Sequence, residues 1–539
     1  MAYLLRERQV AKARTQFLYS NTSSHLVAAV LAAALRRAGG DHPRPVLGYA
    51  RYRRQRGRGL RVDEQVEAVP PLQSTLCDTP LERTSSRMRG KVIVDTAERF
   101  GGRRIDRIGP MDLTVLATDR GSVPMNIGAV LEFDTAGGPS LTAVRALLSE
   151  RVLTIPRLRQ RLRRVPFGCG RPVWVDDPDF VLDRHLIGRE WPRPGGDRKL
   201  LDVAAELICQ RLDPDRPLWR ACLVTDPVGG QAALILVLHH VLADGLGGLA
   251  ILAALADPGL PAPTRRFPQR PPQWGELAVD AARDKMRVAI TLPTRLRSGL
   301  AGLRELGLAR SRPRLIEKTS LNRPTSKRRR FATVAVPLAG IVTAAHRAGG
   351  TVNDVVLAAV TGALITELRA RGEHPARLVV SVPVSGRPAA TADRLGNNTG
   401  VRPIAVPTLA DDNARLAEII SLTRTSRELA RASSAGPLGL AFRALSRLGL
   451  FQTFIEHQRL VHTFETNMRG PAEPLSFGGH GVAAVVPAAV NPGNIGVAFD
   501  ALSYAGVLIV TLVTDPDIVE ELDQLIDSLS TVYARIAKS

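Results

Sequence analysis

The stretch that most constrains the fold of this chain is the apolar run from Ala232 to Leu238, which leads directly into two adjacent histidines, His239 and His240. A continuous apolar run of this length is typical of a buried strand. The residues that follow, 246–257, have the composition of an apolar helix. A strand joined to a helix by a short turn is typical of α/β proteins, so the sequence predicts a mixed α/β fold.

The same kind of pattern recurs along most of the chain. Before the histidine pair we expect a strand over 124–134 and a helix over 140–164 that begins at Ser140 as its N-cap. The region 276–318 is basic and has helical spacing. Further along, strands are predicted over 331–338, 376–385 and 506–515, and helices over 339–349, 353–372 and 517–537.

Breaks in this pattern divide the chain. Residues 1–104 include an arginine-rich run and little strand pattern, so we interpret them as a basic, poorly ordered N-terminal extension. A proline-rich segment follows residue 256, and a basic run precedes residue 331. We therefore expect a first α/β domain over 105–256, a linker and crossover region over 257–330, and a second α/β domain over 331–539.

The charge of the chain raises the question of an anionic partner. Lys and Arg number 73 against 51 Asp and Glu, which gives a net charge of +22. Such an excess favours nucleic acid or an anionic membrane surface. Most of it is arginine in a chain that is also rich in alanine, which is typical of a bias in composition, so nucleic acid is not an expected partner.

Cysteine usage and hydropathy bear on location. The four cysteines, Cys77, Cys169, Cys209 and Cys222, are scattered without metal-ligand spacing, so we expect them reduced and structural in a cytoplasmic protein. The longest early apolar run, 25–35, is shorter than the roughly 20 residues of a membrane span, and no cleavage site of a signal peptide follows it. Any membrane contact is expected to be peripheral.

Two explanations of the histidine pair fit poorly. Neighbouring side chains on a strand point to opposite faces, so His239 and His240 are badly placed to bind one metal ion, and no metal is expected. The segment 245–250 fits the glycine pattern of a dinucleotide-binding loop. However, Arg265 and Arg266 lie where that motif requires an acidic residue.

A catalytic explanation fits better than a pair of satisfied core histidines. Strand alternation directs one histidine toward a cleft and the other inward, and a neutral imidazole suits the removal of a proton from a hydroxyl or amine. Asp244 is expected to hold the loop by a buried ion pair, and Gly245 to permit a tight backbone path. The full pattern H-H-x-x-x-D-G arises by chance in roughly one chain in a thousand of this length.

This pattern resembles the active-site motif of the CoA-dependent acyltransferase superfamily. Within it, the chain looks most like the bacterial wax ester synthase/diacylglycerol acyltransferase family. The resemblance covers residues 105–539 and rests on segments in family order, among them LDPDRPLWRACLV, GGTVNDVVLAAVTGAL, SVPVSGR, LGNNTG and ALSYAGVLIVTLVTD. A departure is TNMRGP, where the family usually has Ser-Asn-x-x-Gly-Pro.

The resemblance implies a fold and an activity. The fold would be two chloramphenicol acetyltransferase-like domains, with mixed sheets flanked by helices and an active-site tunnel between them. The activity would be O-acyl transfer from acyl-CoA to diacylglycerol or a long-chain alcohol, with His240 as general base and no covalent acyl-enzyme. Acyl-CoA is then a substrate, and no cofactor is required. Consistently, the sequence has no G-x-S-x-G nucleophile elbow.

Further residues receive candidate roles, some from this resemblance and some, such as Arg387 at the end of a predicted strand, from their place in a predicted element. Asn353 and Asp354 are either an N-cap of a predicted helix or positioning groups near the active site. Pro217, Leu218 and Trp219 are expected in an acyl pocket or in packing between domains, and Arg387 as the ion-pair partner of Asp244. The basic surface would attract coenzyme A phosphates, or hold the protein on the inner membrane face or on lipid inclusions. The alternatives are acylation of another alcohol or an amine, and a non-catalytic lipid-binding or nucleic-acid-binding relative.

Overall fold

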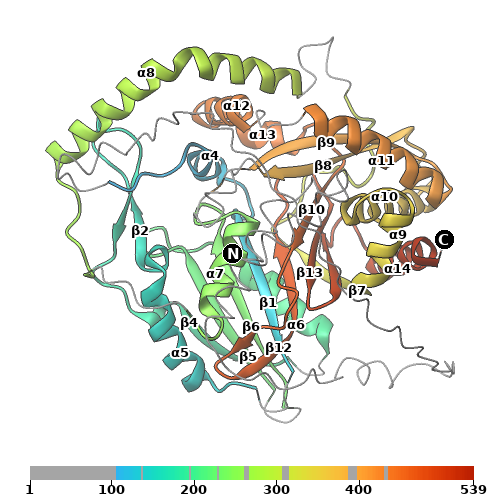
Figure 1. Cartoon of the computed structure of the whole chain (residues 1–539), viewed down its shortest axis with the longest axis horizontal. Coiled ribbons are helices and arrows are strands. Elements are labelled where there is room, and N and C mark those ends of the chain that lie inside the picture. The colour runs from blue at the N-terminus through green and yellow to red at the C-terminus, as the bar shows by residue number, and fades with distance from the viewer. Residues whose placement is uncertain are drawn as a thin grey trace, which may run out of the picture. The chain divides into compact units, whose positions relative to one another are not determined.

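The computed structural model describes residues 105–134, 138–192, 196–226, 230–259, 266–305, 315–385, 397, 399–429 and 435–538. Within them the chain builds two six-stranded sheets, each flanked by helices (Figure 1). The expected basic extension over 1–104, together with Cys77 and Arg387, lies outside the described residues.

The first half of the chain alternates strands and helices. Its elements are α4 (Pro110–Thr118), β1 (Asn126–Phe133), α5 (Leu141–Thr154), η2 (Pro156–Arg159), β2 (Gln160–Arg163), β3 (Val173–Asp176), η3 (Leu182–Arg184), β4 (Leu186–Glu190), α6 (Asp197–Cys209), β5 (Trp219–Thr225), β6 (Ala232–His239), α7 (Gly245–Leu255) and α8 (Trp274–Glu305). The predicted strand over 124–134 is confirmed as β1, and the apolar run that ends in the histidines is confirmed as β6.

The second half adds the remaining elements. These are β7 (Arg330–Pro337), α9 (Leu338–Arg347), α10 (Val352–Ala370), β8 (Arg377–Ser385), β9 (Thr399–Pro407), α11 (Asp412–Leu429), α12 (Ala435–Arg447), α13 (Phe451–Glu456), β10 (Thr463–Arg469), β11 (Ser476–Phe477), β12 (His480–Ala489), β13 (Val497–Tyr504), β14 (Val507–Thr514) and α14 (Leu522–Lys538). No single helix in the described part of the chain is long and apolar enough to cross a bilayer, and α9 and α10 pass that test only as a pair bent by 99°.

Both sheets are mixed, as expected for the α/β class. The first has the order β11-β12-β1-β6-β5-β4, in which only β4 and β5 run parallel. The second has the order β7-β14-β13-β10-β8-β9, with β10 parallel to both β13 and β8. A separate hairpin joins β2 to β3.

The predicted boundary at residue 331 does not separate the two sheets. Strand β12 comes from the second half of the sequence, yet it pairs antiparallel with β1 of the first sheet from Ile127 to Phe133. Apolar side chains of β12 pack beside those of β1, and Val486 is buried next to Val130. The first sheet is therefore complete only with residues from the second half.

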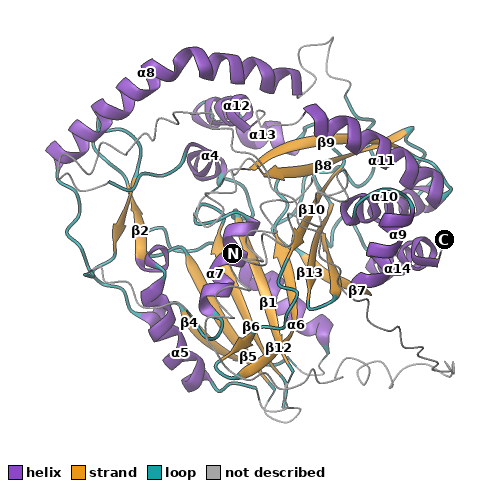
Figure 2. Ribbon diagram, viewed as in Figure 1, coloured by secondary structure: helices purple, strands orange, loops and turns teal. Residues whose placement is uncertain are grey.

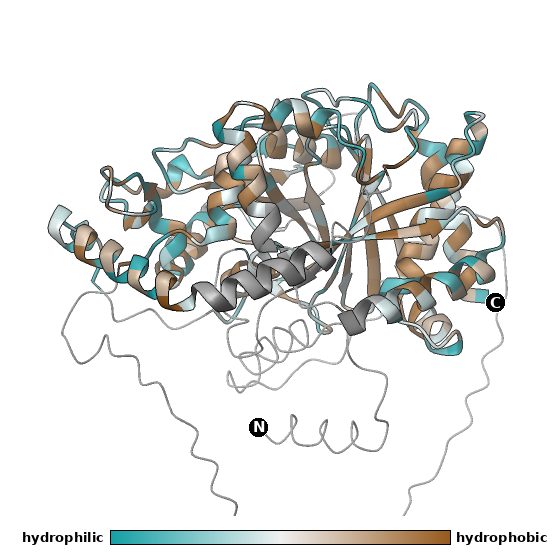
Figure 3. Cartoon of the chain, turned by 90° about the horizontal axis from the view of Figure 1, so that it is seen from above, coloured by the Kyte–Doolittle hydropathy of each residue, from teal (hydrophilic) through white to brown (hydrophobic). Residues whose placement is uncertain are grey.

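Each sheet is covered on both faces (Figure 2). On the first sheet, α5 and α7 pack on one face, and α6 packs on the other together with residues of β7 and β14. On the second sheet, α9, α10 and α14 cover one face in a core that includes Val360 and Leu529. Figure 3 shows apolar residues along the strands and hydrophilic residues on the outer parts of the helices.

Two helix predictions need correction. Ser140 is the N-cap, with its Oγ accepting the Ala143 N–H at 3.1 Å, but α5 ends at Thr154 instead of continuing to 164. Pro156 lacks the amide hydrogen that a continuing helix requires and restricts the residue before it, so the chain turns into η2 and then β2. The last helix begins at Leu522, whereas the apolar spacing predicted a start at 517.

Candidate active site

The histidine pair lies where β6 leaves the first sheet, and its backbone is held from two sides. The His239 N–H donates to the Leu218 carbonyl oxygen at 2.9 Å, and the His240 N–H donates to the Met125 carbonyl oxygen at 2.8 Å. Successive amides on a strand point in opposite directions, and these bonds extend that alternation to the last residue. The backbone of the two histidines is therefore held by the residues that directly precede β5 and β1.

His239 is buried, and both of its ring nitrogens are engaged. Its Nδ1 accepts the Val241 N–H at 3.0 Å, so the proton of the neutral ring lies on Nε2, which is 3.1 Å from Asp119 Oδ2. Arg211 also pairs with Asp119 at 2.9 Å. Burial raises the pKa of Asp119, but the hydrogen bond to His239 and the positive charges nearby outweigh burial, so this pKa is below its usual value. His239 is thus a structural member of a charged network.

His240 differs from its neighbour. It is half-buried, and its Nδ1 is enclosed without a hydrogen-bond partner in the described part of the chain. Nε2 is then the ring nitrogen left to meet a ligand. Strand alternation predicted one inward and one accessible histidine. The backbone N–H groups of the two residues bond to segments on opposite sides of β6, as this alternation requires.

Asn397 connects the second half of the chain to this strand end. Its Nδ2 donates to the His240 carbonyl oxygen at 2.6 Å and to Asp112 Oδ1 at 2.7 Å, and its backbone N–H donates to the same Oδ1 at 2.6 Å. Asp112 is buried in the first turn of α4 and also accepts the Gly109 N–H at 3.2 Å. Burial raises the pKa of Asp112. This bridge holds the backbone of His240 from the opposite half.

The other motif residues, Asp244 and Gly245, form the start of α7. Asp244 is buried and is the N-cap, with Oδ1 accepting the Gly247 N–H at 3.0 Å. Its predicted ion pair with Arg387 remains a prediction, because Arg387 lies outside the described residues. Gly245 is not among the residues with positive φ, so a tight backbone path at this position stays a prediction. A Cβ at Gly245 would overlap Met468 Sδ, so the close approach of this side chain from β10 favours glycine.

The P-L-W segment lies beside the motif on β5. Leu218 and Trp219 are buried in the core of the first sheet, and the Leu218 carbonyl is the one that holds His239. The Trp219 Nε1–H donates to the Leu158 carbonyl oxygen at 2.7 Å, and its ring stacks on His185 at a centroid distance of 4.7 Å. Pro217 is also buried. The segment therefore packs the strand that positions the histidines.

Asn353 and Asp354 do lie at the start of a helix, but Thr351 is the N-cap of α10. Thr351 and Asp354 form a capping box, in which Asp354 Oδ2 accepts the Thr351 N–H at 2.8 Å. Asp354 Oδ1 also accepts the Thr423 Oγ1–H at 2.7 Å, so the carboxylate links α10 to α11. A positioning role for Asn353 and Asp354 in catalysis stays a prediction.

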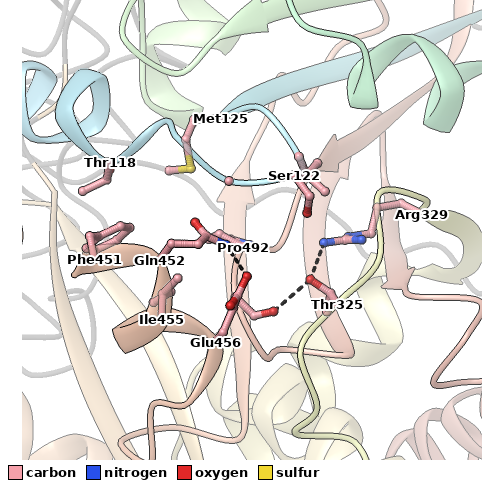
Figure 4. A pocket seen from close by; sticks show the side chains of 13 residues that line it. Thr118, Ser122, Met125, Thr325, Arg329, Phe451, Gln452, Ile455, Glu456 and Pro492 are labelled. Carbon is pink, nitrogen blue, oxygen red and sulfur yellow. Dashed lines mark hydrogen bonds between the residues drawn. The ribbon is translucent and has the colours of Figure 1, made fainter. Parts of the chain in front are cut away.

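A small surface cleft lies beside this network, where residues of both halves meet (Figure 4). Met125, whose carbonyl oxygen holds His240, is on its wall, and Gln452 and Glu456 come from α13. Arg329 lines it as well, with Nη2 donating to Thr325 Oγ1 at 2.9 Å. The cleft therefore reaches the loop that supports the histidine strand end.

Sequence reasoning missed the residues that hold the two histidines. Asp119, Arg211, Asp112 and Asn397 are far from the motif in sequence and approach it only in the folded chain. One of them, Asn397, lies in LGNNTG, a segment with family resemblance, which was the available signal. Among the residues that the structure describes, no group of three or more His, Cys, Asp or Glu could hold a metal ion.

Comparisons with known proteins agree with this geometry. Residues 108–356 match the wax ester synthase/diacylglycerol acyltransferase catalytic domain, and residues 395–537 match the C-terminal domain of the same family. A Mycobacterium tuberculosis protein named a probable diacylglycerol O-acyltransferase is 30% identical over 434 residues, which cover 77% of this chain and 91% of the relative.

Solved structures show the same fold. The wax ester synthase/diacylglycerol acyltransferase from Marinobacter aquaeolei VT8 superposes with a TM-score of 0.58 at 23% identity, over 80% of this chain and 100% of that one. The first condensation domain of the calcium-dependent antibiotic synthetase superposes with a TM-score of 0.54 at 18% identity, over 81% of this chain and 98% of that one. From its sequence matches, the chain belongs to the wax ester synthase/diacylglycerol acyltransferase family and is an acyltransferase.

Proposed function

We propose that this enzyme transfers a long-chain acyl group from acyl-CoA to the hydroxyl of diacylglycerol or a long-chain alcohol, with His240 as general base. The observation that carries the proposal is the difference between the two histidines. His239 has both ring nitrogens bonded, whereas His240 is half-buried with an imidazole that makes no hydrogen bond within the described chain. A general base needs a ring nitrogen free to approach the proton that it removes.

The proposed reaction proceeds in one direct transfer. His240 Nε2 removes the proton of the acceptor hydroxyl, the oxygen attacks the thioester carbonyl, and the carbon–sulfur bond breaks when the tetrahedral intermediate collapses. The departing CoA thiolate then takes the proton from the imidazolium, which restores neutral His240. The products are an ester and CoA, so the step balances without a cofactor or an acyl-enzyme.

The other site residues would act through position. The Asp119–His239 network and the Asn397 bridge hold the backbone of the strand end, and the Asp244 cap begins α7 directly after it. The cleft beside Met125 offers space next to the supporting loop. We extend the proposal to location at a lipid surface, either the inner membrane face or lipid inclusions, because the proposed acceptors and products are insoluble in water.

Replacing Asn397 with alanine is expected to lower kcat about tenfold, which corresponds to ~1.4 kcal/mol in the barrier. The substitution releases the His240 carbonyl and removes the side-chain hydrogen bond to Asp112, whereas the bond from the backbone N–H of residue 397 to Asp112 remains. The acyl-CoA KM changes little because Asn397 holds the base rather than the substrate. Steady-state kinetics with a thermal unfolding curve for each variant separates this effect from loss of fold. An unchanged kcat in folded N397A protein would contradict the positioning role.

The function itself is tested by thiol release from palmitoyl-CoA. Purified protein is given 1,2-diacylglycerol, hexadecanol, hexadecylamine or no acceptor, and free CoA is measured with a thiol reagent. We expect a rate at least about tenfold above the acceptor-free rate with one or both hydroxyl acceptors. Release with the amine alone would replace this function by amide formation, and no release with any acceptor would favour a binding role.

A further inference from the structure

Helix α8 is fixed to the rest of the chain by one face. Leu277 and Ala281 on that face are buried, and the acidic side chains next to them bond inward. Asp280 pairs with Arg107 at 2.5 Å, and Asp284 pairs with Arg171 at 3.2 Å. Residues 277, 280, 281 and 284 have the spacing of one helical face, so this inner side is accounted for by contacts within the chain.

The opposite face of α8 is apolar and uncovered. Val279, Met286 and Ile290 are 52%, 67% and 74% exposed, although apolar side chains of this size usually avoid water. Their spacings of seven and four residues place them along one side of the helix surface, about 140° to 180° from Leu277. The helix therefore has two apolar faces, of which only the inner one is packed.

Charge is divided between these two sides. Asp280 and Asp284 are turned toward the protein and paired with arginines. Arg283, Lys285 and Arg287 are exposed. Lys285 and Arg287 lie about 100° to either side of Met286, and Arg283 lies about 60° from it on the Arg287 side. An apolar stripe bounded by basic residues is the pattern of helices that lie in the interface of an anionic membrane.

Other exposed apolar residues lie on and near α8. Trp274, 67% exposed, is the first residue of α8, and tryptophan is enriched at membrane interfaces. Helix α12 packs beside α8 (Figure 1) and carries Leu440, which is 64% exposed, and Leu448, 71% exposed, directly follows its last residue. Exposed apolar residues thus occur on both of these adjacent helices.

We propose that the outer face of α8, defined by Val279, Met286 and Ile290, is the surface by which this enzyme binds anionic phospholipid membranes. The three apolar side chains would enter the boundary between headgroups and acyl chains. Lys285 and Arg287 would extend along the helix to the phosphates, which their long side chains allow. This face would be the contact surface for the proposed location at a lipid surface. The proposal rests on the proposed function only because the substrates of that function are lipids.

The test is flotation of the full chain with vesicles of phosphatidylcholine containing 30% phosphatidylglycerol, and with vesicles of phosphatidylcholine alone. We expect the double variant M286D/I290D to bind the anionic vesicles at least about tenfold more weakly than wild type. The double variant K285E/R287E should lose binding by a similar factor on the anionic vesicles and change little on neutral ones. The matched control is L153D/V181D, which changes two apolar residues that are each 45% exposed on the first half of the chain and should bind as wild type.

Wild-type binding by M286D/I290D, or equal loss in the control variant, would overturn the proposal. The alternative is that a second copy of this chain covers the outer face of α8. Wild type would then be a dimer in light scattering, and M286D/I290D would be a monomer with unchanged vesicle binding. This result would also overturn the proposal. All variants are assayed with palmitoyl-CoA and hexadecanol dispersed in detergent micelles, which need no membrane. No release of CoA by any of the proteins, wild type included, would contradict the proposed function and leave the flotation result to decide the surface.

Discussion

Alanine at His240 lowers kcat by about a thousandfold, within the range of about a hundred to ten thousand that a general base contributes. Its imidazole is the one in the motif without a structural partner in the described chain, so its removal costs catalysis more than stability. The acyl-CoA KM and the unfolding temperature are expected to stay close to those of wild type. Initial rates with diacylglycerol and a thermal unfolding curve measure both quantities.

The control for this prediction is His239→Gln. A glutamine amide can still donate to Asp119, which keeps the buried carboxylate paired, although it loses the bond from the Val241 N–H. We expect its kcat to fall less than that of H240A, by about tenfold, and its unfolding temperature to fall more. If H239Q lost more activity than H240A while both remained folded, the assignment of the base would be reversed.

Replacing Glu465 with glutamine stabilises the protein at alkaline pH. Glu465 lies on β10, is fully buried, and neither carboxyl oxygen has a hydrogen-bond partner within the described residues. Burial raises its pKa to about 8, and the negative charges of Asp500 and Asp354 add to the shift. Burial also raises the pKa of Asp500 to about 7. The folded chain therefore keeps Glu465 protonated at neutral pH.

The pH dependence follows from this raised pKa. The folded state binds the proton more tightly than the unfolded chain, whose glutamate pKa is near 4.5. The contribution of Glu465 to stability is therefore fully present below about pH 4.5 and is lost as the pH rises to about 8. Each unit of pKa difference is worth about 1.4 kcal/mol, so the loss amounts to a few kcal/mol. Glutamine has no proton to lose, and E465Q should avoid this loss.

Thermal unfolding at pH 5 and pH 9 checks this prediction. We expect E465Q to unfold several degrees above wild type at pH 9 and near it at pH 5. The matched control is Glu473→Gln, an exposed glutamate a few residues further along the chain, which should behave as wild type at both pH values. Equal unfolding temperatures of E465Q and wild type at pH 9 would show that Glu465 is not held neutral.

Local patterns in the sequence predicted what depends on neighbouring residues. The apolar run 232–238 identified β6, Ser140 identified the start of α5, and strand alternation separated His239 from His240. In each case the pattern depends on the periodicity or capping of a single helix or strand. The end of α5 was missed although Pro156 marked it. The alternation of arginine and apolar residues that resembled a helix continues through Pro156 into β2.

Contacts between distant segments could not be predicted in this way. The pairing of β12 with β1 joins residues more than 300 positions apart, and nothing in either strand specifies the other. The Asn397 bridge to Asp112 and His240 depends on the same arrangement of the two halves. Gly245 is an example at a single position. Glycine is favoured there by the close approach of Met468 on β10 and not by a positive φ, and the sequence near Gly245 does not indicate that contact.

The most direct measurement of the central claim is a single turnover with palmitoyl-CoA labelled at the acyl carbonyl carbon, followed in wild type and H240A. The account predicts that without an acceptor no label becomes bound to protein. With diacylglycerol or hexadecanol, label passes into the ester in amounts equal to the CoA released, and H240A forms this ester about a thousandfold more slowly. Label bound covalently to the protein before the acceptor is added, or ester formation at the wild-type rate by H240A, would contradict direct transfer with His240 as base.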